Sequence, residues 1–267
     1  MALKRIQAIV LRQLYLMSES LSRVMPLFAW VGIDMVLWGF ITKYLNSVTA
    51  SGFNFVPVFL GAVLLWDFFT RVMQGVTMAF FEDVWSRNFL NLFATPLSVP
   101  EYLGGLVLCS IGSSAVGLVV MLLLATLFFG LSFLSFGLLL IPILGILFLF
   151  GIALGVLASA SVLRFGPAAE WFVWPLPAML APFAGVFYPV STLPKWMQIL
   201  ARALPPSYVF ECLRAVAAHR AVSGISLAAG GILAVLYIGG ACWFFTRIYR
   251  RALRTGLIAR YSAETVS

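Results

Sequence analysis

Charged residues are scarce in this chain of 267 residues: aspartate, glutamate, lysine and arginine together make up 10% of it. Soluble domains carry about 25% charged residues and about 45–50% apolar residues. Here 63% of the residues are hydrophobic. A soluble protein of this composition would have more apolar surface than one core can bury, so the composition indicates a membrane protein.

Lysine, histidine and cysteine are also rare, and each shortage excludes a class of site. A P-loop ends in Gly-Lys-Ser/Thr, but none of the three lysines (Lys4, Lys43 and Lys195) follows a glycine. ATP hydrolysis within this chain is therefore excluded. A single histidine, His219, and three scattered cysteines cannot supply a metal site or a disulfide framework. We expect no catalytic residue, no metal ligand and no cofactor held by this chain.

The chain contains long apolar runs without a charged residue. Residues 102–163 contain no Asp, Glu, Lys or Arg, and a membrane-spanning helix needs about 20 apolar residues. This stretch therefore predicts two spans and a tight turn. Together with the other apolar runs, it predicts a single all-α polytopic membrane domain over residues 1–267 with six transmembrane helices. The predicted spans are 24–42, 56–81, 103–129, 137–162, 171–189 and 224–246.

The cationic residues gather at the two ends of the chain. Lys4, Arg5, Arg12 and Arg23 precede the first span, and Arg247, Arg250, Arg251, Arg254 and Arg260 follow the last. Such clusters lie on the cytoplasmic side of membrane proteins and suit anionic lipid headgroups. We therefore expect a multi-pass protein of a bacterial-type cytoplasmic (inner) membrane with both termini in the cytoplasm. The net charge of +8 requires no nucleic-acid partner.

Residues 3–20 are predicted to form an amphipathic helix in the membrane interface. Its apolar residues recur at helical spacing, while Lys4, Arg5, Arg12 and Glu19 avoid that stripe. The stripe consists of Leu3, Ile6, Val10, Leu14 and Met17.

Residues 82–101 form a polar segment between the second and third spans, in a loop that the predicted topology places in the cytoplasm. Glu82 and Asp83 suit the positive end of a helix, and Pro96 and Pro100 are expected to close the segment. The segment is too polar to span a membrane and too apolar for a plain linker, so the pattern predicts a helix that docks on a partner. The predicted docking residues are Glu82, Asp83, Trp85, Arg87, Phe89 and Leu92.

Residues 190–220, on the predicted external side, read as two short amphipathic helices that meet at Pro205 and Pro206. Such a pair can enter the outer leaflet as a re-entrant hairpin if protein shelters its backbone, and its arginines can then snorkel to the interface. The span before it carries four prolines within 175–189 and is expected to be distorted. The hairpin's candidate residues are Pro189, Leu193, Pro194, Trp196, Pro205, Pro206, Tyr208 and Arg214.

Three ionisable residues fall near the middle of the first two spans. Asp67 and Arg71 are spaced i,i+4 and therefore share a helix face, and Asp34 would lie at a similar depth. Isolated charges are costly at this depth, so we expect the three to pair. They either line a substrate path, together with Trp30 and Trp38 on the face of Asp34, or join helices or subunits without touching substrate.

Two stretches resemble the type-2 ABC exporter permease family. One runs from Gly185-Val-Phe-Tyr-Pro-Val-Ser-Thr-Leu-Pro-Lys-Trp through Leu-Pro-Pro-Ser-Tyr to Glu211-Cys-Leu-Arg214, and the other is Leu92-Phe-Ala-Thr-Pro-Leu-Ser98. The chain departs from the family at 85–88, where many members carry Gly-Thr and this sequence has Trp-Ser-Arg-Asn.

The resemblance implies a permease that pairs with a second permease copy, most simply as a homodimer. It also implies a separate P-loop ATPase subunit, which would hold ATP and Mg²⁺. Residues 3–20 and 82–101 would then be the interface and coupling helices, and 190–220 an external gate. The implied activity is export of an amphipathic or lipid-linked substrate, such as a lipid, glycan or drug. An ion-coupled secondary transporter and an intramembrane enzyme are the alternatives.

Overall fold

The computed structural model describes residues 2–18, 21–48, 56–86, 91–92, 95–131 and 133–255. Within these residues every regular element is a helix, which confirms the predicted all-α class. The long helices are α1 (Ala2–Ser18), α2 (Leu21–Val48), α3 (Gly61–Trp85), α5 (Val99–Phe129), α6 (Leu140–Phe165) and α11 (Gly224–Thr255). The shorter helices are η1 (Val56–Leu60), η2 (Phe133–Leu139), η3 (Pro167–Ala169), α7 (Glu170–Val173), α8 (Leu176–Ala184), η4 (Val190–Thr192), α9 (Lys195–Ala203) and α10 (Pro205–Ala217).

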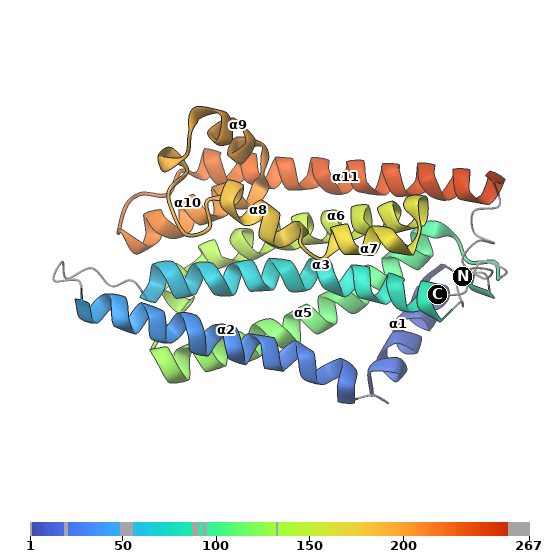
Figure 1. Cartoon of the computed structure of the whole chain (residues 1–267), viewed down its shortest axis with the longest axis horizontal. Coiled ribbons are helices and arrows are strands. Elements are labelled where there is room, and N and C mark those ends of the chain that lie inside the picture. Colours follow the sequence, from blue (N-terminus) through green and yellow to red (C-terminus); the bar gives the residue numbers. More distant parts are fainter. Residues whose placement is uncertain are drawn as a thin grey trace.

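Helix α3 runs through the middle of an elongated bundle (Figure 1). It packs against α5 and α6, while α11 packs on the far side of α6 and α2 lies along the opposite edge. Helix α1 lies at one end of the long axis, and α9 and α10 lie towards the other. We call these the α1 end and the hairpin end.

Small residues let α3 and α6 approach closely. A methyl group added at Gly151 would lie 2.9 Å from Cβ of Val72, and one added at Gly155 would lie 2.8 Å from Cβ of Val76. Small residues four positions apart permit the same close packing in many membrane helix pairs. The glycine spacing on α6 therefore sets the core contact of the bundle.

Four helices are long and apolar enough to cross a membrane, judged by length and composition over the described residues: Val58–Trp85, Val99–Phe129, Phe136–Phe165 and Gly224–Thr255. The chain is thus a multi-pass membrane protein. Helix α2 covers the predicted span 24–42 but is not among these four. A total of six spans stays a prediction.

The segment predicted as the fifth span, 171–189, is divided into two short helices. Helix α7 ends at Val173, and α8 begins at Leu176, directly after Pro175. Helix α8 ends at Ala184 and is followed by Gly185, whose φ of +61° is a conformation that favours glycine. The prolines and this glycine thus produce a broken element rather than one continuous helix.

Candidate functional site

The α1 end is built around the carboxylate of Asp83, which is fully buried. Asp83 lies in the last turn of α3, where the helix dipole disfavours a negative charge. Arg12 of α1 forms an ion pair with this carboxylate, and the Tyr102 hydroxyl of α5 donates a hydrogen bond to Asp83 Oδ2 at 2.7 Å. Because a buried carboxylate is stable only when it is paired, these three residues join α1, α3 and α5. We call them the Asp83 cluster.

A second ion pair attaches α1 to the start of α5. Arg5 Nη1 lies 3.3 Å from Glu101 Oε1. Glu101 also accepts a hydrogen bond from the backbone N–H of Ser98 at 2.8 Å, so it caps the helix that it belongs to. A carboxylate in the first helical turn is favoured by the helix dipole. The same carboxylate therefore fixes the start of α5 and holds α1 on it.

Helix α1 sits on a glycine of α5. Ile9 is buried, and a methyl group at Gly105 would overlap its side chain. The predicted apolar stripe of α1 is divided: the side chains of Leu3 and Leu14 are 68% and 55% exposed, whereas Ile6 and Val10 are half-buried. The Met17 side chain lies outside the described residues. An outward apolar face suits contact with lipid, while Arg5 and Arg12 hold the other side to the bundle.

Two predictions for the segment 82–101 are wrong. Glu82 and Asp83 do not open a helix, because α3 continues through them to Trp85 without a helix-breaking residue. Asp83 is also too deeply buried to touch a partner protein. Pro100 does not close the segment but lies in the first turn of α5, where proline is tolerated.

The surface of the α1 end is formed in part by Trp85, whose side chain is 50% exposed. Glu82 and Leu92 are half-buried. The predicted contact residues Arg87 and Phe89 lie outside the described residues. Among the predicted docking residues that the structure describes, Trp85 offers the largest apolar surface.

The predicted ionisable cluster at mid-depth is anchored on α3. Arg71 Nε donates to Asp67 Oδ2 at 2.9 Å, and both side chains are largely buried. The Arg71 side chain packs against Gly117 of α5. A methyl group added at Gly117 would lie 3.5 Å from Cδ of Arg71. Asp34 of α2 is half-buried and lies within electrostatic range of both residues. The structure thus pairs Asp67 with Arg71 inside one helix and places Asp34 nearby.

Of the two tryptophans predicted beside Asp34, Trp38 contacts the hairpin end. Its ring stacks on Phe187 with a centroid distance of 4.9 Å and an interplanar angle of 13°. Phe187 follows the break after α8, so this stack connects α2 to the segment that leads into the hairpin. The side chain of Trp30 lies outside the described residues.

Helices α9 and α10 make up the predicted hairpin. Pro205 and Pro206 are not the turn between the two helices but form the first turn of α10, so Leu204 alone joins them. The hydroxyl of Ser207 bonds the carbonyl of Ala201, and that of Tyr208 bonds the carbonyl of Arg202. These bonds fix the angle between α9 and α10.

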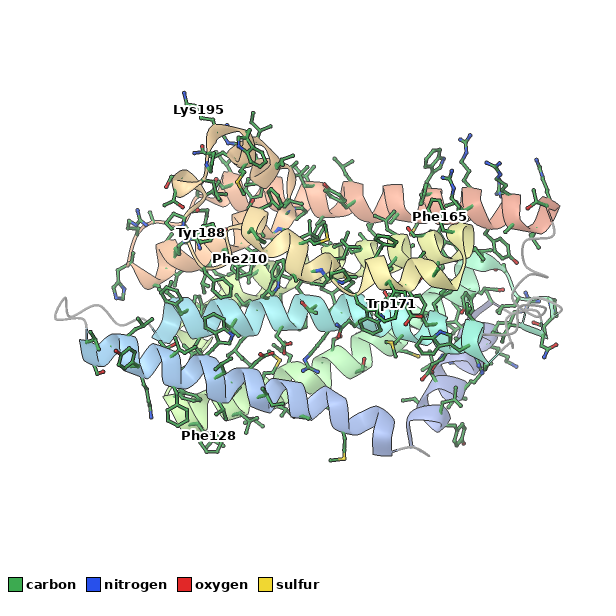
Figure 2. All side chains as sticks on the ribbon, viewed as in Figure 1. Phe128, Phe165, Trp171, Tyr188, Lys195 and Phe210 are labelled. Atoms are coloured by element: carbon green, nitrogen blue, oxygen red, sulfur yellow. The ribbon has the colours of Figure 1, made fainter. Side chains whose placement is uncertain are left out.

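The remaining predicted hairpin residues differ in exposure. Leu193 is buried, whereas Trp196 is 60% exposed and makes an edge contact with the ring of Phe183. Pro189 and Pro194 are exposed and precede η4 and α9. Lys195 points away from the bundle and Phe210 lies inside it (Figure 2). The hairpin therefore has one face in the bundle and an exposed face that carries Trp196.

Arg214 does not snorkel outwards, contrary to the prediction, because its guanidinium closes a turn inside the hairpin. It is 9% exposed and donates from Nη1 to the Gly185 carbonyl at 2.8 Å and from Nη2 to Glu211 Oε1 at 3.0 Å. The same Glu211 oxygen accepts the Val190 N–H at 2.8 Å. Burial lowers the pKa of Arg214, and the Glu211 carboxylate opposes this shift. We call Gly185, Glu211 and Arg214 the Arg214 latch.

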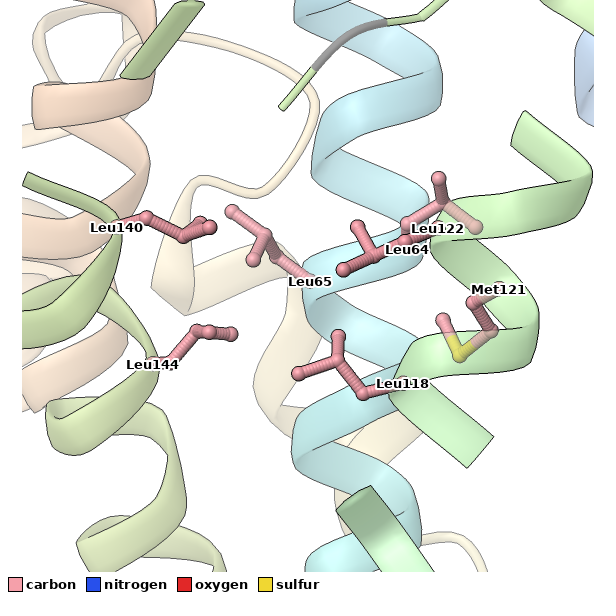
Figure 3. Close-up of a pocket in the computed structure, with 7 residues that line it drawn as sticks. All are labelled: Leu64, Leu65, Leu118, Met121, Leu122, Leu140 and Leu144. Carbon is pink, nitrogen blue, oxygen red and sulfur yellow. The ribbon is translucent and has the colours of Figure 1, made fainter. Parts of the chain in front are cut away.

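A narrow apolar crevice lies between α3, α5 and α6, away from these polar groups (Figure 3). No polar side chain lines it, so it offers nothing to orient a polar substrate. Its lining residues are Leu64, Leu65, Leu118, Met121, Leu122, Leu140 and Leu144.

A comparison with protein-family models identifies the family of the chain. The model of the ABC-2 type transporter family matches residues 5–217, which is most of the chain. The chain belongs to the ABC-2 type transporter family. A comparison with curated proteins gives no match. ABC-2 proteins are the membrane permease component of ABC transporters, are generally not catalytic themselves and generally work with an ATPase subunit.

The matched region of this ABC-2 protein contains the Asp83 cluster, the Asp67–Arg71 pair and the Arg214 latch. Within the described residues, no group of three or more His, Cys, Asp or Glu side chains could hold a metal ion. The three cysteines are free thiols.

Several residues of this ABC-2 permease that the structure brings into these sites were not predicted from the sequence. The spacing Ser98-x-x-Glu101 is that of a capping box, and Glu211-x-x-Arg214 is that of an i,i+3 ion pair, so both could have been found. Nothing in a single sequence could have paired Arg12 with Asp83, because the two residues are far apart in the chain. Tyr102 carries no such signal either.

Proposed function

We propose that this chain is the transmembrane permease subunit of an ATP-driven ABC exporter that moves an amphipathic or lipid-linked molecule out of the cytoplasm or inner leaflet. The observation that carries the proposal is the family match over 5–217. The lack of a P-loop lysine supports it, because a pump without its own ATPase needs one from another chain.

The proposed complex contains two permease copies and a separate P-loop ATPase subunit that binds ATP and Mg²⁺. Six spans place both termini on the same side of a cytoplasmic (inner) membrane. The cationic ends of the chain favour the cytoplasm for that side. In this topology the α1 end faces the ATPase, and the hairpin end faces outwards.

Coupling in this proposal begins at Trp85 and the residues after it. Closure of the ATPase on ATP would push this surface, and the Asp83 cluster would pass the displacement from α3 to α1 and α5. The support is geometric: a rigid group of helices can transmit a push only if its members are joined, and a buried ion pair with a hydrogen bond joins all three.

The hairpin end is the proposed gate. Trp38 of α2 stacks on Phe187, and the Arg214 latch holds the backbone of Gly185 and Val190 against α10. A shift of α2 relative to the bundle would therefore act directly on the segment that the latch holds.

Co-purification tests this function. A tagged copy of the chain, expressed in its own host, is expected to bring with it a P-loop ATPase subunit. The complex should hydrolyse ATP, the chain alone should not, and substitution of the P-loop lysine in the partner should abolish hydrolysis. Transport by the chain alone in vesicles, driven by an ion gradient without nucleotide, would contradict the proposal and favour a secondary transporter.

A further inference from the structure

The outward face of α11 changes chemistry along its length. Ile225, Ile232 and Leu236 are 86%, 63% and 64% exposed, and Trp243 on the same face is 63% exposed. Helical spacing then continues this face through Arg247, Arg250 and Arg254, at four, seven and eleven residues after Trp243. One stripe therefore passes from aliphatic to aromatic to cationic residues.

This stripe lies opposite the side of α11 that packs in the bundle. Ala241, Phe245, Ile248 and Ala252 are buried, whereas all the arginines of the stripe are exposed. Long nitrogen-tipped side chains stand out from the C-terminal part of α11, away from the other helices (Figure 2). The stripe is a surface for a partner that approaches from outside the bundle.

The apolar part of the stripe is about as long as the hydrocarbon core of a bilayer is thick, and the cationic part follows it directly. From Ile225 to Trp243 the helix rises by roughly 27 Å, close to the hydrocarbon thickness of about 30 Å. Tryptophan is enriched at the boundary between hydrocarbon and headgroups, so Trp243 marks that level. Arg247 and Arg250 follow within roughly 11 Å of helix rise, at the depth of the headgroups.

Among the residues that the structure describes, no acidic side chain pairs with the charges of the stripe. Helix α11 contains no acidic residue, and no described carboxylate forms an ion pair with Arg247, Arg250 or Arg254. The Arg247 guanidinium lies over the Trp243 ring, 5.4 Å from its centroid, and this cation–π contact holds Arg247 beside Trp243. These arginines would be neutralised by an anion that lies at their depth in the membrane, next to aliphatic chains that cover the apolar part of the stripe.

We propose that Arg247, Arg250 and Arg254 bind the headgroups of anionic phospholipids whose acyl chains lie along the aliphatic part of the stripe. The continuity of the stripe favours a lipid over a protein partner, because a lipid presents apolar chains and an anion in this order. The proposal concerns the permease alone and holds whether or not the chain drives ATP-dependent export.

Quenching by brominated lipids tests the site. The full chain is reconstituted in vesicles of phosphatidylcholine and phosphatidylglycerol, with one of the two lipids brominated in each series. The signal of Trp243 is the difference between the parent protein and its Trp243→Phe variant. We expect phosphatidylglycerol to be preferred next to Trp243 by roughly fivefold or more, since one arginine near an anionic surface contributes about 1 kcal/mol.

The triple variant Arg247→Gln/Arg250→Gln/Arg254→Gln should reduce this preference to about one. A matched triple variant at the other end, Lys195→Gln/Arg202→Gln/Arg220→Gln, removes three exposed cations and should leave the preference unchanged. Equal quenching by both lipids in the parent, a preference that survives the first triple variant, or one that the control abolishes equally would overturn the proposal. Absence of quenching at Trp243 would also overturn it, because protein would then cover the stripe.

Discussion

Each end of the bundle holds a buried charged group at its centre, and the two ends satisfy that group in different ways. At the α1 end the carboxylate of Asp83 is held by side chains from two other helices, Arg12 and Tyr102. At the hairpin end the guanidinium of Arg214 is held by the Gly185 carbonyl and by Glu211, three residues away on its own helix.

The difference follows from the donor and acceptor inventory of the two groups. A carboxylate only accepts hydrogen bonds, so away from free backbone N–H groups it needs donors from other side chains, whereas a guanidinium has five N–H groups and can use backbone carbonyls. The α1 end therefore depends on three helices staying together. The hairpin end depends on the conformation of one turn.

Replacement of the carboxylate at the α1 end should have the largest effect. Asp83→Ala leaves Arg12 without its ion-pair partner and Tyr102 without its acceptor, so we expect a loss of about 3–5 kcal/mol in the free energy of unfolding. Denaturant unfolding in detergent micelles measures it. The matched control is Glu170→Ala, because Glu170 accepts an exposed hydrogen bond from Trp174, which directly follows the same short helix. A loss below about 1 kcal/mol for Asp83→Ala, equal to that expected of the control, would show that the cluster does not hold the helices together.

The corresponding change at the hairpin end should be smaller and more local. Arg214→Gln removes the bonds to Gly185 and Glu211, and we expect a loss of about 2–3 kcal/mol in the free energy of unfolding. Amide hydrogen exchange should rise at Val190, whose N–H bonds Glu211, while Ile9 at the α1 end keeps its protection. Arg202→Gln, at an exposed arginine of the same hairpin, is the control. If amide hydrogen exchange rose equally at Val190 and Ile9, the effect of Arg214 would not be confined to the hairpin end, which would contradict the comparison.

The pair at mid-depth should give the smallest effect when it is measured as the coupling energy of a double-mutant cycle. Asp67→Ala strands a buried Arg71, whereas Asp67→Ala in an Arg71→Ala background strands nothing. We expect a coupling energy of about 1–2 kcal/mol in the free energy of unfolding. Additive losses would show that the two side chains stabilise the protein independently.

Local patterns predicted much of this molecule because they depend on neighbours in the sequence. The charge-free run of 102–163 predicted α5 and α6, the i,i+4 spacing predicted the Asp67–Arg71 bond, and the prolines of 175–189 predicted a distorted element. In each case the residues that decide the structure lie within one or two helical turns or in one apolar run.

Predictions failed where distant residues decide the structure. Asp83 looked like the acidic start of a new helix, but Arg12 and Tyr102 stabilise it in the last turn of α3 instead. Arg214 looked like a snorkelling residue, but the positive φ of Gly185 turns a carbonyl towards it. A single sequence does not show which helices are neighbours, so neither arrangement could be derived from it.

Cysteine cross-linking tests most directly the central claim that the α1 end docks the ATPase subunit. Cys109, Cys212 and Cys242 are first replaced by alanine, and single cysteines are then placed at Trp85→Cys and Trp196→Cys, two exposed positions at opposite ends. The account predicts that the cysteine at 85 cross-links to the ATPase subunit in the purified complex and that the cysteine at 196 does not. A cross-link from 196, or none from 85, would contradict it.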